Sequence, residues 1–380
     1  MRLIYFIPLL STFGGQERTL IDKANWLVEK GHEILFVTFA NDEGVAYSLR
    51  EDVRHVDLAC RYFHIYRLPF VRRFYAAFQV KRLFRHKMAE TVIAFQPDVV
   101  VVAIPLTEFF CHDLFKVVGN IPIVVESHLA CGHEAIARGL TEKLIDFFIP
   151  PMDAIRKADL LIALTEGDAN IWRKYHHHHV CVIPNPLTSY PEDLPHIEQT
   201  EGRIICVGRL SPQKRLDRLI DAFAMIADKY SDWCVDIFGE GQIQGKLLLK
   251  QLITERGLDR RVNICSPVRD IYSEYRRSQF LVLSSDFEGF GLVVTEAMAC
   301  GIPVVATDCP FGPSEIIEDG KTGLLAKMDA KDLADKMEWM MTHDEERRLM
   351  GVNAHQAAAR FRKEIIMPQW EEAYLSVIKS

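Results

Sequence analysis

The most constraining feature of the sequence is a pattern in which short, continuous apolar runs alternate with longer amphipathic stretches. Runs that are apolar at every position are typical of parallel strands, because helices cover both faces of a parallel sheet. The pattern therefore predicts β-α-β units rather than an antiparallel sandwich or a helical bundle. The strands expected in the first half are 3–7, 34–39, 53–58, 99–104, 123–126, 160–164 and 180–183.

A polar, proline-containing stretch interrupts this pattern, which then starts again. Later strands are expected at 203–207, 233–238, 262–265, 280–283 and 303–306, and the last fifty residues are expected to be helical. We therefore predict the α/β class, with two doubly wound, Rossmann-like domains at 1–187 and 203–362 and a linker at 188–202. Ligands of such sheets bind at the carboxyl ends of the strands, so a site is expected in an interdomain cleft.

Composition excludes several classes of protein. The 380 residues carry 45 Lys and Arg against 52 Asp and Glu, and this net charge of −7 argues against a dedicated nucleic-acid binder. The nine cysteines are scattered singly, which fits a reducing cytoplasm. No apolar run reaches the ~18–20 residues needed to cross a bilayer, and the run at 1–10 is shorter than a signal peptide requires. A cytoplasmic protein that is not integral to a membrane is expected.

A first phosphate-binding candidate directly follows the expected strand 203–207. Gly208 and Arg209 open this stretch, and Lys214 lies five residues after the arginine. An Arg and a Lys at the carboxyl end of a strand could clamp a diphosphate through charge-assisted hydrogen bonds. The alternative is a solvated helix start, and this stretch alone does not decide between them.

A second candidate, Glu288 to Glu296, follows the expected strand 280–283. Gly289 and Gly291 allow close approach of the backbone to a ligand, and a helix is expected from about Leu292, whose free amides favour phosphate. Glu296 would lie one turn into that helix, where an acidic residue can hold a ribose diol, and Glu288 in the loop could reach a sugar. The alternative is that Glu296 only caps or solvates the helix.

Together these motifs resemble the retaining glycosyltransferases of family 4, which have the two-domain GT-B fold. The resemblance is carried by Gly14-Gly15, Gly208-Arg209 with Lys214, Gly239-Glu240-Gly241, Glu288 to Glu296, and the strand entry at Gly301. The stretch 308–315 resembles the form found in bacterial enzymes that assemble surface polysaccharides and lipid-linked glycans. The resemblance also implies that the helix at 363–380 crosses back to the N-terminal, acceptor-binding domain, with Trp370 and Tyr374 as core residues.

The resemblance implies a role for each matching residue. Arg209 and Lys214 would bind the donor diphosphate, Glu288 the transferred sugar, and Glu296 the ribose. Gly291 and Leu292 would offer backbone amides to the phosphates, beside Gly208. In the first domain, the Gly14-Gly15 loop would face the donor phosphates. His128, directly after the strand 123–126, would match the active-site histidine near the sugar, although a histidine at a strand end is more often structural. The expected catalytic residues are His128, Glu288, Arg209 and Lys214.

The expected chemistry is metal-independent transfer from a nucleotide-diphosphate sugar, with a UDP-hexose or UDP-N-acetylhexosamine favoured. Negative charge develops on the departing diphosphate, so cations and amide dipoles directed at it are expected to contribute most to stabilising the transition state. The sequence contains no Asp-x-Asp, so no metal site is expected, and no cofactor is expected apart from the sugar nucleotide. Retention of anomeric configuration is implied by the resemblance alone. The competing functions are another GT-B enzyme, such as a phosphorylase or a sugar-nucleotide epimerase, and a non-catalytic two-lobed binding protein.

A local basic segment lies between residues 60 and 89, where no acidic residue occurs. Its candidate acceptor or membrane residues are Arg72, Arg73, Lys81, Arg82 and Arg85. An apolar stripe of Phe70, Phe74, Ala77, Phe84 and Met88 is interrupted by Lys81. One interpretation is docking on the anionic inner face of the cell membrane, to reach a glycan acceptor linked to undecaprenyl pyrophosphate. The other is a helix that packs its stripe on the sheet and solvates its charges. For the run His176–His179, a catalytic role is not expected.

Overall fold

The computed structural model describes residues 1–41, 44–62, 65, 68–104, 107–128, 155–175, 179–193 and 202–378. The chain divides into two units. Unit 1 comprises Met1–Ile183 and Met367–Ser380, and unit 2 comprises Pro184–Ile366. Each unit is built around its own parallel sheet, so the expected α/β class with two Rossmann-like sheets is confirmed.

Unit 1 contains a seven-stranded sheet with the order β3-β2-β1-β4-β5-β6-β7, in which every neighbouring pair is parallel. Its strands are β1 (Arg2–Phe6), β2 (Glu33–Thr38), β3 (Arg54–Asp57), β4 (Val99–Ile104), β5 (Ile123–Ser127), β6 (Leu160–Ala163) and β7 (Val180–Val182). Its helices are α1 (Gly15–Glu29), α2 (Phe70–Phe95), α3 (Glu108–Val118) and α6 (Glu166–Tyr175).

Alternate side chains of these strands belong to opposite faces of the sheet, as the pleat requires. Ile4, Phe6 and Val125 share one hydrophobic cluster with residues of α2, α3 and α6. On the other face, Tyr5 and Glu126 bond to residues of α1 and of the last helix. Helices on both faces explain why the strands are apolar at nearly every position.

Unit 2 contains a six-stranded parallel sheet with the order β10-β9-β8-β11-β12-β13. Its strands are β8 (Gly202–Val207), β9 (Trp233–Phe238), β10 (Val262–Cys265), β11 (Phe280–Leu283), β12 (Val304–Thr307) and β13 (Gly323–Ala326). The longer helices are α7 (Leu216–Ile226), α8 (Ile243–Glu255), α9 (Ile271–Arg276), α10 (Leu292–Ala299), α12 (Ala330–Thr342) and α13 (Asp344–Ala358). The chain order reverses between β8 and β11, which is where ligands of such sheets bind.

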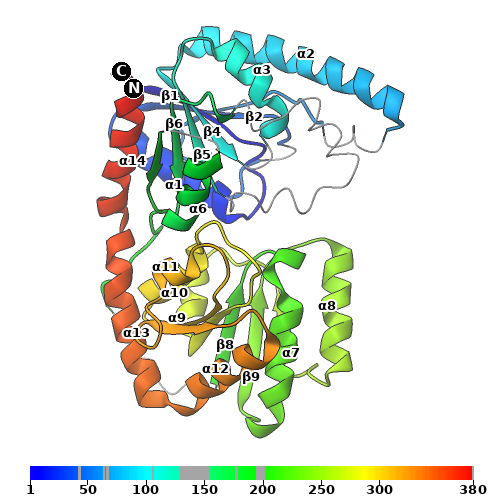
Figure 1. Ribbon diagram of the computed structural model, residues 1–380, viewed down its shortest axis with the longest axis vertical. Coiled ribbons are helices and arrows are strands. Elements are labelled where there is room, and N and C mark those ends of the chain that lie inside the picture. Colours follow the sequence, from blue (N-terminus) through cyan, green and yellow to red (C-terminus); the bar gives the residue numbers. More distant parts are fainter. Residues whose placement is uncertain are drawn as a thin grey trace. The chain divides into compact units, whose positions relative to one another are not determined.

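The last helix, α14 (Lys363–Ile378), begins in unit 2, and its later turns belong to unit 1 (Figure 1). There Tyr374 and Trp370 are fully buried, and the Tyr374 hydroxyl lies 3.0 Å from that of Tyr5. The expected return of the C-terminal helix to the first domain is therefore confirmed.

The segment after Ile183 is bonded to unit 2. The amide of Leu187 donates to the carbonyl of Phe361, and the amide of Ser189 donates to the hydroxyl of Tyr272. Part of the linker expected at 188–202 is thus held against unit 2, while residues 194–201 lie outside the described ones.

One strand was absent from the sequence prediction. Strand β13 was missed because GLLA is short and follows two turn-forming residues, so it gave no distinct apolar run. Packing on the sheet and docking on a membrane were both left open for the apolar stripe, and the structure divides it: Phe84 and Met88 are fully buried, whereas Phe74 is 48% exposed. Only the C-terminal half of α2 packs its full stripe on the sheet. The interrupting residue Lys81 lies 3.5 Å from Asp113, which accounts for a cation in the stripe.

Candidate functional site

In unit 2, the loops that follow β8 and β11 are bonded directly to each other. The side chain of Gln213 donates to the carbonyl of Phe287 over 2.7 Å, and the amide of Asp286 donates to the carbonyl of Gln213 over 2.9 Å. The hydroxyl of Ser284 donates to the carbonyl of Lys214 over 2.8 Å. Because β8 and β11 are neighbours, the two sequence motifs meet at the carboxyl edge of the sheet.

Lys214 and Glu288 form an ion pair where these loops meet. Lys214 Nζ lies 2.6 Å from Glu288 Oε1, and the hydroxyl of Ser285 donates to the same oxygen over 2.5 Å. Their side chains are 14% and 8% exposed, so the pair is mostly covered by protein but still reaches solvent. Arg209, in the same β8 loop, is exposed. The structure thus brings together the cation and the carboxylate that the sequence placed 74 residues apart.

Glu296 lies one turn into α10, as the sequence predicted. Helix α10 begins at Leu292, directly after Gly291, whose φ of 99° is in the left-handed region that favours glycine. The hydroxyl of Tyr275, a fully buried residue of α9, donates to Glu296 Oε2 over 3.0 Å. This bond fixes the carboxylate at the start of the helix.

Three residues that sequence reasoning missed support this site: Ser285, Tyr275 and Arg218. The buried guanidinium of Arg218 donates to the carbonyl of Ser284 over 2.7 Å and to Asp286 over 2.7 Å, so it holds the loop that carries Glu288. Tyr275 and Arg218 form hydrogen bonds with residues far away in the sequence, so no local sequence motif indicates these contacts. The contact of Ser285 could have been predicted, since this residue follows shortly after β11 and lies three residues before Glu288.

The Gly239-Glu240-Gly241 turn packs against the β8 loop. A Cβ on Gly239 would lie 1.9 Å from the carbonyl oxygen of Gly208, so only glycine fits there. The amide of Leu210 donates to the carbonyl of Glu240 over 2.8 Å. The turn therefore fixes the backbone that carries Arg209 and Lys214.

In unit 1, Gly14 and His128 follow the carboxyl ends of two parallel strands. Gly14 caps the N-terminus of α1, and Gly15 is the first residue of that helix. His128 directly follows β5, its side chain is 3% exposed, and its Nε2 lies 2.8 Å from Glu126 Oε2. Glu126 is fully buried and lies 2.5 Å from Nζ of Lys23, a fully buried residue of α1.

Burial and the mutual attraction of the charges oppose each other in setting the pKa values of Lys23, Glu126 and His128. Burial lowers the pKa of Lys23 to about 8, against the attraction of Glu126. Burial alone would raise the pKa of Glu126, but the charge of Lys23 and the hydrogen bond from His128 outweigh it and lower the pKa to about 2. Burial also lowers the pKa of His128, although Glu126 opposes this change. At pH 7 the group thus holds a charged Lys23–Glu126 pair and a neutral His128.

The basic segment along α2 is largely occupied by contacts within unit 1. Lys81 and Arg85 lie 3.5 and 3.6 Å from the carboxylate of Asp113. The ammonium of Lys87 donates to the carbonyl of Leu58 over 2.8 Å, and Arg73 donates to the carbonyl of Leu68 over 3.2 Å. Exposed residues on this helix include Arg72, Phe74, Tyr75, Phe78 and Arg82.

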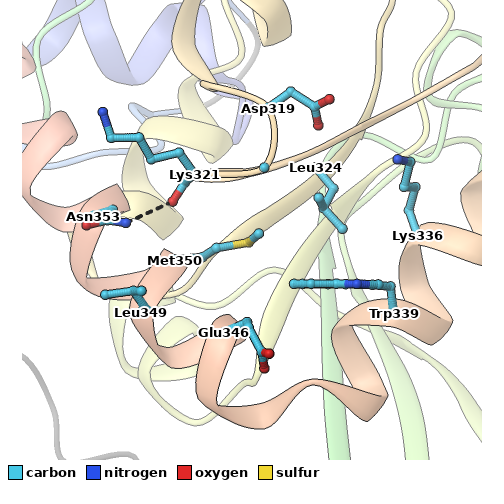
Figure 2. A pocket seen from close by; sticks show the side chains of 10 residues that line it. Asp319, Lys321, Leu324, Lys336, Trp339, Glu346, Leu349, Met350 and Asn353 are labelled. Carbon is cyan, nitrogen blue, oxygen red and sulfur yellow. Dashed lines mark hydrogen bonds between the residues drawn. The ribbon is translucent and has the colours of Figure 1, made fainter.

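A surface groove of unit 2 lies between the β13 region and the helices α12 and α13 (Figure 2). Trp339, Met350 and Leu324 line it together with charged side chains, and the Asn353 amide donates to the carbonyl of Lys321 across one end. None of the residues predicted to bind the donor lines this groove.

Among the described residues, no helix is long and apolar enough to cross a membrane. No group of three or more His, Cys, Asp and Glu side chains there could hold a metal ion. Of the histidine run, residues 176–178 lie outside the described part of the chain.

The sequence matches two family descriptions, one in each half. Residues 13–188 match "Glycosyltransferase Family 4", and residues 194–357 match "Glycosyl transferases group 1". Together the two matches leave only the ends of the chain and a short stretch between them uncovered. The chain belongs to the glycosyltransferases of this family 4 and group 1 type, and its fold is GT-B.

Two of the curated relatives carry names that refer to bacterial exopolysaccharide or lipopolysaccharide. The chain is 35% identical over 202 residues to an exopolysaccharide phosphotransferase of Streptomyces coelicolor, over 52% of this chain but only 21% of that protein. It is 27% identical over 330 residues to an uncharacterized glycosyltransferase of Haemophilus influenzae, over 86% of each chain. It is 23% identical over 333 residues to the lipopolysaccharide 1,6-galactosyltransferase of Escherichia coli, over 86% of this chain and 84% of that one.

Solved structures share the whole fold. Sucrose-phosphate synthase of Thermosynechococcus elongatus superposes with a TM-score of 0.82 at 19% identity, over 100% of this chain and 99% of that one. Anabaena HepE in complex with UDP-glucose superposes with a TM-score of 0.77 at 21% identity, over 99% of this chain and 100% of that one. At these identities the likeness concerns the fold alone.

Proposed function

We propose that this enzyme transfers a hexose or an N-acetylhexosamine from a UDP-sugar to a glycan acceptor, with retention of configuration, in bacterial polysaccharide synthesis. The observation that carries the proposal is the Lys214–Glu288 pair beside α10 at the carboxyl edge of the unit 2 sheet. Two relatives are named as enzymes that transfer a hexose or an N-acetylhexosamine: a lipopolysaccharide galactosyltransferase and a poly(ribitol-phosphate) N-acetylglucosaminyltransferase. HepE, of the same fold, has been crystallised with UDP-glucose.

The donor diphosphate would be bound when Lys214 exchanges Glu288 for a phosphate as its ionic partner. Lys214 is partly exposed, so its ammonium can turn from Glu288 to a phosphate without a large change in burial. Arg209 adds a second, exposed cation from the same loop. The free amides at the start of α10, Leu292 among them, add the positive end of a helix dipole. Glu296, held by Tyr275, would accept the ribose hydroxyls.

These groups act mainly on the leaving group. Negative charge grows on the diphosphate as the glycosidic bond breaks, and fixed cations and amides stabilise it without reorganisation. Glu288, released from Lys214, would bind the transferred sugar, and His128 would contact that sugar from unit 1. Because the cations come from Lys214 and Arg209, we propose that transfer needs neither a metal nor another cofactor. Transfer should then be unchanged by a chelator.

The first test is turnover of purified protein with UDP-glucose, UDP-galactose and UDP-N-acetylglucosamine, preceded by a thermal-shift panel that includes GDP- and ADP-sugars. Lys214→Ala and Glu288→Ala should each abolish transfer while leaving the fold intact. Lys250→Ala, which removes the same charge from an exposed site on α8, is the matched control. Full turnover by Lys214→Ala or Glu288→Ala would refute the assignment.

We further propose that the acceptor is lipid-linked, carried by undecaprenyl pyrophosphate, and that an exposed patch on α2 docks the protein on anionic lipid at the inner face of the cell membrane. The patch consists of Arg72, Phe74, Tyr75, Phe78 and Arg82, and it omits Lys81, which faces Asp113. Cations with exposed aromatic rings favour an anionic interface.

Co-sedimentation with vesicles of anionic lipid at low salt tests the patch. Arg72→Glu/Arg82→Glu should release the protein from the vesicles. Lys246→Glu/Lys250→Glu, which reverses two charges on α8, should not. Wild-type protein that stays in the supernatant would remove the membrane proposal and leave the transfer proposal standing.

A further inference from the structure

Unit 1 contains a buried group of charged and polar side chains where the sequence pattern calls for apolar residues. Glu126 follows three apolar residues in strand β5, and Lys23 lies among the buried residues of α1. Both are fully buried, as are Tyr5 and Tyr374. The network comprises Lys23, Glu126, Tyr5 and Tyr374, and it ends at His128.

Both oxygens of Glu126 are bonded. Oε2 accepts from Lys23 Nζ over 2.5 Å and faces His128 Nε2 at 2.8 Å. Oε1 accepts from the hydroxyl of Tyr374, which also lies 3.0 Å from the hydroxyl of Tyr5. The ring of Trp370 covers the Lys23 ammonium, with Nζ 3.4 Å from the ring centroid. The carboxylate is therefore held from α1 and from the C-terminal helix at once, and Tyr5 of β1 contacts it only through Tyr374.

This geometry determines the tautomer of His128. An ionised carboxylate only accepts hydrogen bonds, so the 2.8 Å contact requires a hydrogen on Nε2. In a neutral imidazole, Nδ1 then carries the lone pair. Among the described residues, no hydrogen bond to Nδ1 is found, and this is the nitrogen on which the proposal below depends.

We propose that Lys23, Glu126 and Tyr374 form a positioning network that holds His128 with its hydrogen on Nε2, so that Nδ1 accepts a hydrogen bond from a hydroxyl of the transferred sugar. The inference rests on the proposed function, since it assumes that His128 contacts the sugar. Lys23, Glu126 and Tyr374 do not touch the substrate themselves. The C-terminal helix α14 would then contribute to the orientation of His128, because Tyr374 and Trp370 belong to this helix.

A buried ion pair is by itself a poor stabiliser, because desolvation offsets most of the attraction between the charges. Replacing both charges together keeps the electrostatic balance of the core, whereas replacing one leaves an unpaired charge. The variants are therefore made in pairs. Lys23→Met/Glu126→Gln keeps an oxygen that can accept from His128 Nε2. Lys23→Met/Glu126→Leu removes that oxygen at similar volume.

Steady-state kinetics with the accepted UDP-sugar separate the two double variants. Lys23→Met/Glu126→Gln should keep kcat within about threefold of the wild type. Lys23→Met/Glu126→Leu should lower kcat by roughly ten- to a hundredfold, the loss of one buried hydrogen bond, with donor KM nearly unchanged. Equal kcat values for two double variants of equal melting temperature would show a structural role only and overturn the proposal.

A second readout does not depend on turnover. In protein labelled with ¹⁵N at histidine, the His128 ring nitrogens, assigned by comparison with His128→Asn, should show the Nε2–H form in the wild type. Lys23→Met/Glu126→Leu should shift them towards a mixture of tautomers. Glu371→Gln serves as the control: it removes the charge from another contact of α14, the 2.7 Å contact between Glu371 and His32, and should change neither readout.

Failure of the proposed function and failure of the network proposal give different results in these experiments. If the wild type transfers sugar but His128→Asn turns over as fast, the role given to His128 is wrong. If the wild type transfers no sugar, the proposed function fails, while the tautomer measurement still tests the network. A wild-type His128 with its hydrogen on Nδ1 would overturn the network proposal in every case.

Discussion

Each unit places a Lys–Glu pair near its candidate site, and the two pairs differ in their surroundings. In unit 1, Lys23 and Glu126 are both fully buried and bonded to further side chains. In unit 2, Lys214 and Glu288 are 14% and 8% exposed, and they lie on loops. A fully buried charge cannot leave its partner without a large desolvation cost, whereas a partly exposed one can exchange partners. This contrast agrees with the positioning role proposed for the first pair and with the ligand-binding role proposed for the second.

Breaking the buried pair should have the largest effect on stability. Lys23→Met leaves the Glu126 carboxylate without its counter-charge and should lower the free energy of unfolding by about 3–5 kcal/mol. Lys23→Met/Glu126→Gln should recover most of this loss. Denaturant unfolding, followed separately for the two units by hydrogen exchange, measures both values. A loss below about 1 kcal/mol in the single variant would contradict the contrast between the pairs.

Acid should weaken unit 1 through the same carboxylate. The pKa of Glu126 is about 2 in the fold, below its ordinary value of 4.5. The unfolded chain therefore binds this proton first, so the contribution of Glu126 is fully present above pH 4.5 and is lost as the pH falls towards 2. The loss should be a few kcal/mol and should be absent from Lys23→Met/Glu126→Gln. Unfolding measured from pH 6 to pH 3 for both proteins gives the difference.

The glycines of the two units offer a third comparison. A Cβ on Gly239 would meet the backbone oxygen of Gly208 at 1.9 Å, so Gly239→Ala must push two loops apart. It should cost about 1–3 kcal/mol and weaken UDP binding. A Cβ on Gly14 would meet a carboxylate oxygen of Glu17, at the end of a flexible side chain. Gly14→Ala should therefore cost well under about 1 kcal/mol. Thermal unfolding of both variants checks this order, and equal costs would contradict it.

A much smaller stability effect than that of Lys23→Met is expected at the unit 2 pair. Lys214→Met removes a partly solvated ion pair and should lower the free energy of unfolding by no more than about 1 kcal/mol. Thermal unfolding of this variant beside Lys23→Met measures the difference directly. Similar losses in the two variants would mean that partial exposure does not distinguish the pairs.

Most strands of the two sheets could be predicted from the sequence, because each one is a short apolar run. Strands β4, β9, β10 and β11 begin and end at the predicted residues. Glu296 was placed correctly because its position depends only on a local glycine turn and a helix start. Strand β13 was missed because four residues give too little pattern.

Long-range polar contacts were not predictable in the same way. The bond from Tyr275 to Glu296 joins two elements that only the fold brings together. The buried network did leave a signal in the sequence. Glu126 is a charge that follows three apolar residues in its strand, and Lys23 lies on the apolar face of α1, beside Leu20 and Leu27. Two misplaced charges of opposite sign on neighbouring elements predict a buried pair, although not its link to His128.

The central claim is that the Lys214 loop binds a nucleotide diphosphate, and titration calorimetry with UDP tests it most directly. Wild-type protein and Lys250→Ala should bind UDP with equal affinity. Lys214→Met should bind it at least about tenfold more weakly at the same melting temperature, through loss of a charge-assisted contact. Equal affinity of Lys214→Met and the wild type for UDP would contradict the account.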